Sequence, residues 1–117
     1  MLLDNGALGE ARVLAPRSVR AMTADHLLPG TRNTVGVTSA NNDGYGFGLT
    51  VAVRPSVGGP PTLGSPGDFT WGGAFGTVFW VDPQEQLAVV FMAQAPGLRL
   101  RHNHRLVNSL VYQAITE

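Results

Sequence analysis

Two histidines near the C-terminus are the residues whose type and spacing best fit a metal site. His102 and His104 lie two positions apart, as zinc ligands sometimes do, but no carboxylate or third imidazole stands beside them in the sequence. Two ligands without further donors are a weak match to known zinc patterns. We therefore expect solvated side chains just before the last helix, with no metal and no cofactor.

Two further patterns are similar to known ligand-binding or catalytic motifs. Ser39-Ala40-Asn41 has the Ser-x-Asn form of some acyl-transfer enzymes, but it stands in a loop rich in Thr and Asn, so a polar turn is favoured. The glycines of Gly72-Gly73-x-x-Gly76 do not form a phosphate cradle, because the Walker lysine is absent and they lie in a predicted strand. Glycines inside a strand indicate that a backbone or a ligand approaches closely.

The composition excludes several mechanisms. All eight basic residues of the 117 are arginines, so no lysine amine is present to act as a base, a Schiff base or a phosphate ligand. The absence of cysteine excludes thiol nucleophiles, thiolate metal sites and disulfides. A formal net charge of zero argues against nucleic-acid binding, which depends on clustered cations.

No segment of the sequence predicts a membrane span or a leader. No apolar run approaches the roughly 18 residues that a spanning helix needs, and no charged, apolar and small-residue leader opens the chain. We expect a cytoplasmic protein if the chain is expressed as it stands, although the compartment of any longer parent stays open.

The chain is expected to form a single unit of the α+β class, an antiparallel β-sheet flanked by helices. Residues 1–43 are predicted to form a connecting helix and loops, with Pro16 at the first helical position, where its missing N–H is no loss. Met1, Leu2 and Leu3 lead directly into Asp4-Asn5-Gly6, a sequence typical of a helix end, so we expect the chain to begin at the tail of a longer element.

Residues 44–94 are predicted to contain the antiparallel strands. Alternating side chains indicate one strand over 44–54 and a second over 69–81, and an apolar run indicates a third over 87–93. Residues 100–117 are predicted to form the C-terminal helix, whose apolar face carries Leu106, Val107, Leu110, Val111, Ala114 and Ile115.

One layer of this arrangement is missing. The strand over 87–93 is apolar on both sides, which is typical of a strand covered on two faces. Only one long amphipathic helix is present to cover a face. We therefore expect the second layer to be absent or to be supplied by a partner.

The order of the segments resembles the C-terminal part of the serine β-lactamase and penicillin-binding-protein-like hydrolases, closest to the branch that joins class C β-lactamases with related esterases. The resemblance spans nearly the whole chain, and it depends on order and spacing more than on any single motif. It runs through Gly44-Tyr45-Gly46-Phe47-Gly48, Trp71-Gly72-Gly73, Phe75-Gly76-Thr77, Val81-Asp82-Pro83, the strand Leu87–Met92 and the helix Leu110–Ile115.

The resemblance implies a partial β-lactamase/transpeptidase-like fold and one wall of an active site. Trp71-Gly72-Gly73 stands where β-lactamases have Lys-Thr-Gly, so these three residues would line the substrate site. The backbone N–H of Ala74 would be an oxyanion-hole donor. Replacing an ammonium by an indole favours neutral esters or amides over anionic lactams.

The sequence departs from the family pattern at the nucleophile and the base. Ser-x-x-Lys cannot occur without lysine, and neither Tyr45-Gly46-Phe47 nor Tyr112-Gln113-Ala114 has the Tyr-x-Asn form. The leading hypothesis is therefore a C-terminal fragment of a serine hydrolase whose parent acts on a small ester, amide or lactam through an acyl-enzyme. The fragment would be inactive alone.

Two other hypotheses remain open. The exposed apolar sheet face would make the chain a non-catalytic assembly or binding module, either a homo-oligomer or the partner of a complementary N-terminal fragment. The third hypothesis is an independent binder of small ligands that uses the strand faces around Phe47 and Trp71.

Overall fold

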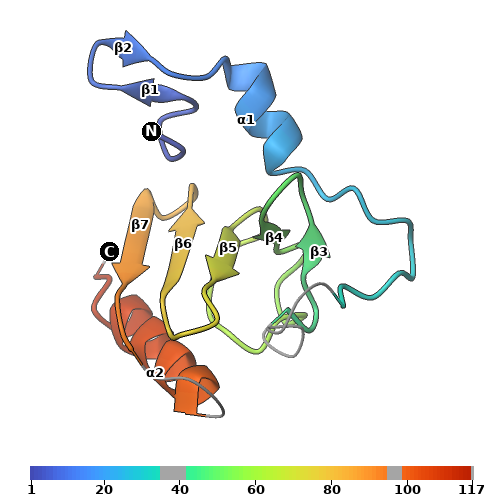
Figure 1. Ribbon diagram of the computed structural model, residues 1–117, viewed down its shortest axis with the longest axis vertical. Coiled ribbons are helices and arrows are strands. Elements are labelled where there is room, and N and C mark those ends of the chain that lie inside the picture. Colours follow the sequence, from blue (N-terminus) through green and yellow to red (C-terminus); the bar gives the residue numbers. More distant parts are fainter. Residues whose placement is uncertain (35–41, 95–98, 117) are drawn as a thin grey trace.

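The structure is a computed structural model that describes residues 1–34, 42–94 and 99–116, with only the backbone described for 99–101. Within these residues a five-stranded antiparallel sheet has the order β3-β4-β5-β6-β7, and a separate two-stranded hairpin pairs β1 with β2. The elements are β1 (Ala7–Leu8), β2 (Ala11–Arg12), α1 (Pro16–Met22), β3 (Gly46–Phe47), β4 (Ala52–Val53), β5 (Phe69–Gly72), β6 (Val78–Asp82), β7 (Leu87–Phe91) and α2 (Arg99–Gln113). The expected antiparallel sheet flanked by helices is confirmed (Figure 1).

The predicted strand over 44–54 is wrong, because the chain reverses in its middle. β3 and β4 are a tight hairpin in which the Gly48 N–H donates to the Val51 carbonyl over 2.8 Å. Gly48 also lies against the end of α1, where a Cβ would overlap the Met22 carbonyl oxygen. The alternation of side chains continues through the turn, so the sequence pattern does not reveal the reversal.

The predicted strand over 69–81 is also two strands. β5 and β6 pair from Phe69↔Val81 to Gly72↔Val78, and the glycine-containing segment between them is a turn. The Gly73 N–H donates to the Thr77 carbonyl over 2.7 Å, and Gly76 has a φ of 116°, which favours glycine. The sheet therefore has five strands where three were expected.

The register assigns the large side chains of the sheet to two faces. Trp71, Phe79 and Val90 are cross-strand neighbours on one face, whereas Thr70, Trp80 and Val89 are neighbours on the other. α2 covers the second face, where His104 makes an edge-to-face contact with Phe91 at 6.1 Å between ring centroids.

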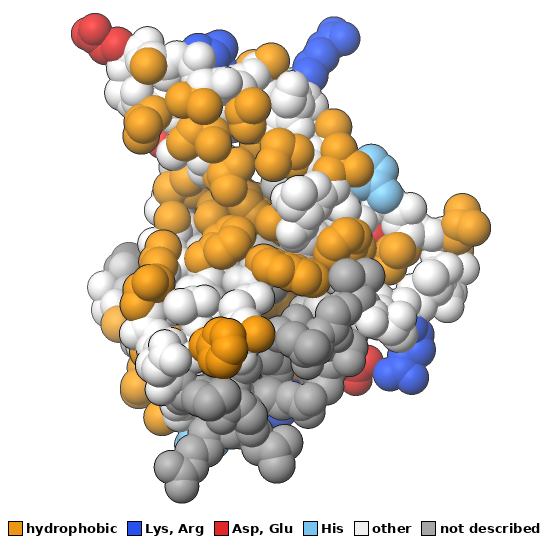
Figure 2. All heavy atoms as spheres, in the orientation of Figure 1, with side chains coloured by type: hydrophobic (Ala, Val, Ile, Leu, Met, Phe, Trp, Pro, Cys, Tyr) orange, Lys and Arg blue, Asp and Glu red, His pale blue; other side chains and the backbone are white. Residues whose placement is uncertain are grey.

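The first face is covered only at one end. Its buried cluster consists of Val51, Val53, Phe69 and Val81, and the N-terminal residues Leu2 and Leu3 pack against it. Toward the other end, Val90 and Met92 are 70% and 74% exposed. Figure 2 shows apolar side chains gathered over the sheet on the side that the view presents. The face opposite α2 is therefore packed at one end and exposed at the other.

α2 does not bury the face that its apolar pattern predicted. Leu106 and Leu110 are 48% and 55% exposed, whereas His104 and Asn108 are buried. The buried pair replaces apolar packing with hydrogen bonds to the backbone of the sheet region, described below. Among the described residues, no helix has both the length and the apolar content that crossing a bilayer requires.

Candidate functional site

The structure brings the predicted substrate-site residues together at the end of β5. Trp71 and Gly72 are the last residues of the strand, and Gly73 follows in the turn. A Cβ at position 73 would overlap the Thr77 hydroxyl, so a larger residue there would require the Thr77 side chain to move. The sequence motif therefore lies where β5 ends and the chain turns toward β6.

The turn that follows presents the backbone of Ala74. The Gly76 N–H donates to the Gly73 carbonyl over 3.2 Å and closes the turn beneath Ala74, which is exposed. Among the described residues, the Ala74 N–H has no hydrogen-bond acceptor. The exposed backbone of Ala74 therefore directly follows the Trp71-Gly72-Gly73 motif.

The face of the sheet opposite α2 is packed at only one end and is called the uncovered face below. It forms an apolar groove beside this turn. Its volume is about 360 Å³. Its lining residues are Trp71, Gly72, Gly73, Thr77, Val78, Phe79, Val90 and Met92. The Trp71 ring is held in an edge-to-face contact with Phe47, with ring centroids 5.5 Å apart. The groove has no titratable side chain among its lining residues, so it suits uncharged, apolar groups.

The opposite face of β5 is supported by a buried ion pair. The Arg54 Nε donates to Asp68 Oδ2 over 2.7 Å, and both side chains are almost fully buried. The second guanidinium nitrogen donates to the Tyr45 and Thr62 hydroxyls and to the Leu63 carbonyl. Burial raises the pKa of Asp68 to about 6 despite the hydrogen bond and charge of Arg54. This cluster holds the beginning of the motif strand.

A second buried carboxylate connects the sheet to the end of α2. Asp82 Oδ2 accepts hydrogen bonds from the Tyr112 hydroxyl over 2.8 Å and from the Ser65 N–H over 3.0 Å. Burial alone would raise the pKa of Asp82, but the bonds from Tyr112 and Ser65 outweigh burial and hold it below its usual value. Burial and the contact with Asp82 raise the pKa of the Tyr112 hydroxyl.

The prediction that both C-terminal histidines are solvated is wrong for His104. His104 lies inside α2, is buried, and its Nε2 is 3.0 Å from the Gly76 carbonyl oxygen, so it supports the turn after β5 from behind. His102 is exposed, as expected. No cluster of three metal-ligating side chains occurs in the described part of the chain. The Ser39-Ala40-Asn41 tripeptide lies outside the described residues.

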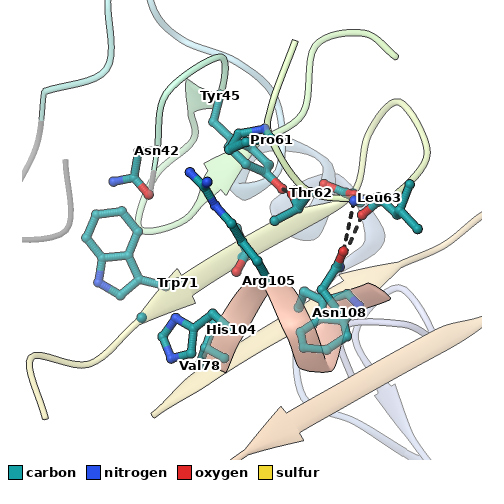
Figure 3. Close-up of a pocket in the computed structure, with 14 residues that line it drawn as sticks. Asn42, Tyr45, Pro61, Thr62, Leu63, Trp71, Val78, His104, Arg105 and Asn108 are labelled. Atoms are coloured by element: carbon teal, nitrogen blue, oxygen red, sulfur yellow. Dashed lines mark hydrogen bonds between the residues drawn. The ribbon is translucent and has the colours of Figure 1, made fainter. Parts of the chain in front are cut away.

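Asn108 is a second residue that the sequence pattern missed. It does not belong to the apolar face predicted for the last helix, yet it is buried and pairs with the backbone of Leu63. The Leu63 N–H donates to Asn108 Oδ1 over 2.8 Å, and Asn108 Nδ2 donates to the Leu63 carbonyl over 3.2 Å (Figure 3). These partners are 45 positions apart, so no local sequence signal indicates the contact.

A protein-family model and two curated proteins match this sequence. The family model described as Beta-lactamase matches residues 5–112. Two Mycobacterium tuberculosis proteins, the uncharacterized protein MT1414 of strain CDC 1551 / Oshkosh and protein Rv1367c of strain ATCC 25618 / H37Rv, are each 34% identical over 97 residues. That match covers 80% of this chain, and the chain spans about a quarter (24%) of each relative.

Solved structures have the same fold. Unliganded simvastatin synthase (LovD) from Aspergillus terreus has a TM-score of 0.68 at 20% identity, covering 95% of this chain and 31% of that one. EstCE1, a hydrolase with promiscuous acyltransferase activity, has a TM-score of 0.58 at 25% identity, covering 86% of this chain and 26% of that one. With a family model that matches nearly its whole length, the chain belongs to the beta-lactamase family.

Proposed function

We propose that these residues form the substrate-binding wall of a serine hydrolase that cleaves esters or amides through an acyl-enzyme. The observation that carries the proposal is the end of β5, where Trp71, Gly72 and Gly73 border the apolar groove and the free Ala74 N–H follows. Ala74 would donate to the oxyanion of the tetrahedral intermediate. The description of EstCE1 as a hydrolase with promiscuous acyltransferase activity supports the same class of chemistry.

The lining of the groove supports neutral substrates. An indole stands where an ammonium would hold the carboxylate of a lactam, and no other lining residue is cationic. An anionic substrate would lose hydration here without gaining a counter-charge. Uncharged esters and amides are therefore the substrate class that the wall favours, and anionic lactams are disfavoured.

The chain would be inactive alone. It has no lysine for Ser-x-x-Lys. Both tyrosine hydroxyls already have structural partners: Tyr45 interacts with Arg54 and Thr62, and Tyr112 donates to Asp82. Burial raises the pKa of Tyr45 to about 12, which opposes its use as a base. The nucleophile and the base would come from a segment that packs on the uncovered face.

A serine-reactive fluorophosphonate probe tests this assignment on the purified 117-residue chain. We expect no labelling, with EstCE1 as a labelled control. Stoichiometric labelling of one serine of this chain would contradict the proposed inactivity, because it would show an activated nucleophile within these residues.

The role of Ala74 is tested in a longer parent protein that contains the nucleophile. Ala74→Pro removes the N–H and is expected to lower kcat for a neutral ester by about 100- to 1,000-fold. Ala74→Gly keeps the N–H and is the matched control, expected to stay near the parent rate. Equal rates for the two variants would remove Ala74 from the oxyanion hole.

A second proposed function is a non-catalytic assembly module. The specific observation in its favour is the exposed apolar end of the uncovered face, with Val90 and Met92 at 70% and 74% exposure. Large exposed apolar patches mark interaction surfaces in soluble proteins. In this case a second copy or a complementary fragment would cover the face without any hydrolysis.

A further inference from the structure

β7 is the last strand of the five-stranded sheet, and its outer edge is open. Within the described residues β7 has one neighbouring strand, β6, and Figure 1 shows no strand beyond it. The β3 edge at the other end of the sheet is covered by the loop after α1. There the Phe47 N–H donates to Asp25 Oδ1, and the His26 N–H donates to the Phe47 carbonyl. The sheet therefore has one covered edge and one open edge.

The hydrogen-bond pattern identifies the backbone groups that point outward from β7. The Gly73 N–H donates to the Thr77 carbonyl, so the odd-numbered residues of β6 bond to β5 and its even-numbered residues bond to β7. Those even-numbered residues pair with the odd-numbered residues of β7. The N–H and C=O groups of Ala88 and Val90 therefore point away from the sheet, and unpaired groups of this kind are a template for another strand.

The β7 edge has none of the features by which proteins block the addition of a strand. Such features include charged side chains, proline and β-bulges. Leu87–Phe91 contains no charge and no proline, and its register with β6 is continuous. Both residues with outward backbone groups are also solvent-exposed, Val90 at 70%. The edge is therefore accessible and chemically suited to a further strand.

A second copy of β7 matches this edge along its whole length. In an antiparallel pair centred on Val89, Leu87 lies opposite Phe91 of the second copy and Ala88 lies opposite Val90. Every cross-strand pair is then apolar, and such pairs stabilise a sheet. Each Ala88–Val90 pair exchanges both of its N–H···O hydrogen bonds, because these are the residues whose groups point outward.

The charge beside β7 favours the antiparallel orientation. Glu85 is the charged residue closest in sequence to the strand. In a parallel pair Glu85 would lie beside its own copy, and like charges in that position are destabilising. The antiparallel register places it opposite Ala93. A two-fold pair also closes on itself, and the covered β3 edge does not extend it, so the assembly stops at two copies.

We propose that β7 is a self-association edge through which two copies of this chain pair, with Leu87–Phe91 antiparallel and centred on Val89. The contact is made by the backbone edge and uses no residue of the Trp71-Gly72-Gly73 motif. It is therefore independent of the proposed hydrolase function. It also differs from coverage of the uncovered face, because the second copy lies beside the sheet and continues it.

Disulfide cross-linking tests the register on the purified 117-residue chain, which has no cysteine of its own. Val89→Cys gives each copy one thiol, and the proposed register places the two substituted positions directly opposite, with Cα atoms about 4.5 Å apart. That separation suits a disulfide. On mild oxidation we expect a cross-linked dimer at a yield several-fold above that of Val57→Cys, a control site that is 74% exposed. Equal yields from the two variants would overturn the proposed pairing.

A proline substitution tests the hydrogen bonds at the edge. Ala88→Pro removes an outward N–H and leaves the bonds between β6 and β7 in place, whereas Ala88→Ser keeps the N–H and is the matched control. Analytical ultracentrifugation measures the dimer dissociation constant, and circular dichroism checks that each variant is folded. We expect Ala88→Pro to raise this constant by about 10-fold or more, and Ala88→Ser to leave it near that of the unmodified chain. An unmodified chain that stays monomeric, or folded variants that dimerise equally well, would overturn the proposal.

Discussion

The two faces of the central sheet are completed in different ways. On the face toward α2, buried polar groups are paired with one another: Arg54 with Asp68, and Asp82 with Tyr112. On the opposite face, apolar residues are buried near the N-terminal segment and become exposed toward Val90. Within the described residues, one side of the sheet is covered by α2 and by paired polar groups, whereas the other side is packed only near the N-terminal segment.

Breaking the buried ion pair should have the largest effect on the completed face. Asp68→Asn leaves the Arg54 guanidinium buried without a counter-charge, and we expect the free energy of unfolding to fall by about 3–5 kcal/mol at pH 8. Urea denaturation followed by tryptophan fluorescence measures the change.

The matched control is an ion pair on the surface with a similar distance between its nitrogen and oxygen atoms. Arg32 and Asp43 are 3.0 Å apart, with side chains 80% and 64% exposed. Asp43→Asn should cost at most about 1 kcal/mol, since solvent screens the pair. Similar losses of unfolding free energy in the two variants would show that the buried pair stabilises the fold no more than a surface pair does.

Removing the Tyr112 hydroxyl should have an intermediate effect that depends on pH. Tyr112→Phe deletes a hydrogen bond to a charged acceptor, and we expect a loss of about 1.5–3 kcal/mol at pH 7. Because the folded pKa of Asp82 is lowered, the stability that it contributes is present above its unfolded pKa of about 3.9 and is lost as the pH falls through the folded pKa.

The loss caused by Tyr112→Phe should therefore shrink as the pH is lowered below about 4. Chemical denaturation at pH 7 and at successively lower pH values measures this dependence. A loss that is equal at all pH values would show that the tyrosine acts through packing instead of through the carboxylate.

A pair of identical substitutions compares the closed and open ends of the apolar face. Val81 and Val90 point to the same face, but Val81 is 5% exposed and Val90 is 70% exposed. Val81→Thr buries a hydroxyl and should cost about 1–3 kcal/mol, whereas Val90→Thr should change stability by less than about 0.5 kcal/mol. Equal costs in denaturation experiments would mean that Val90 is buried in solution, for example by self-association.

The sequence predicted the class of fold because that class depends on local patterns. Alternation located the sheet, and Pro16 marked the start of α1. Strand number was missed because the Gly48–Val51 turn continues the alternation and contains no Asn-Gly or Asp-Gly signal. The glycines at 72, 73 and 76 indicated a close approach of the backbone, but not that the chain reverses there.

The sequence indicated only the part of the candidate site that borders the apolar groove. The positions of Trp71, Gly72, Gly73 and Ala74 followed from a motif that is continuous in the sequence. The supports behind it were missed, since His104 and Asn108 bond to backbone atoms 28 and 45 positions away. His104 was expected to be solvated before the last helix, and Asn108 is absent from the apolar face predicted for that helix, so only tertiary contacts reveal that both are buried.

The most direct test of an uncompleted face is the behaviour of the purified 117-residue chain in solution. Light scattering and the fluorescence of a hydrophobic dye are measured together over a range of protein concentrations. We expect dye binding at low concentration, with self-association as the concentration rises, and Val90→Asp should reduce both. A stable monomer that excludes the dye would contradict the claim that one face of this sheet awaits a further layer.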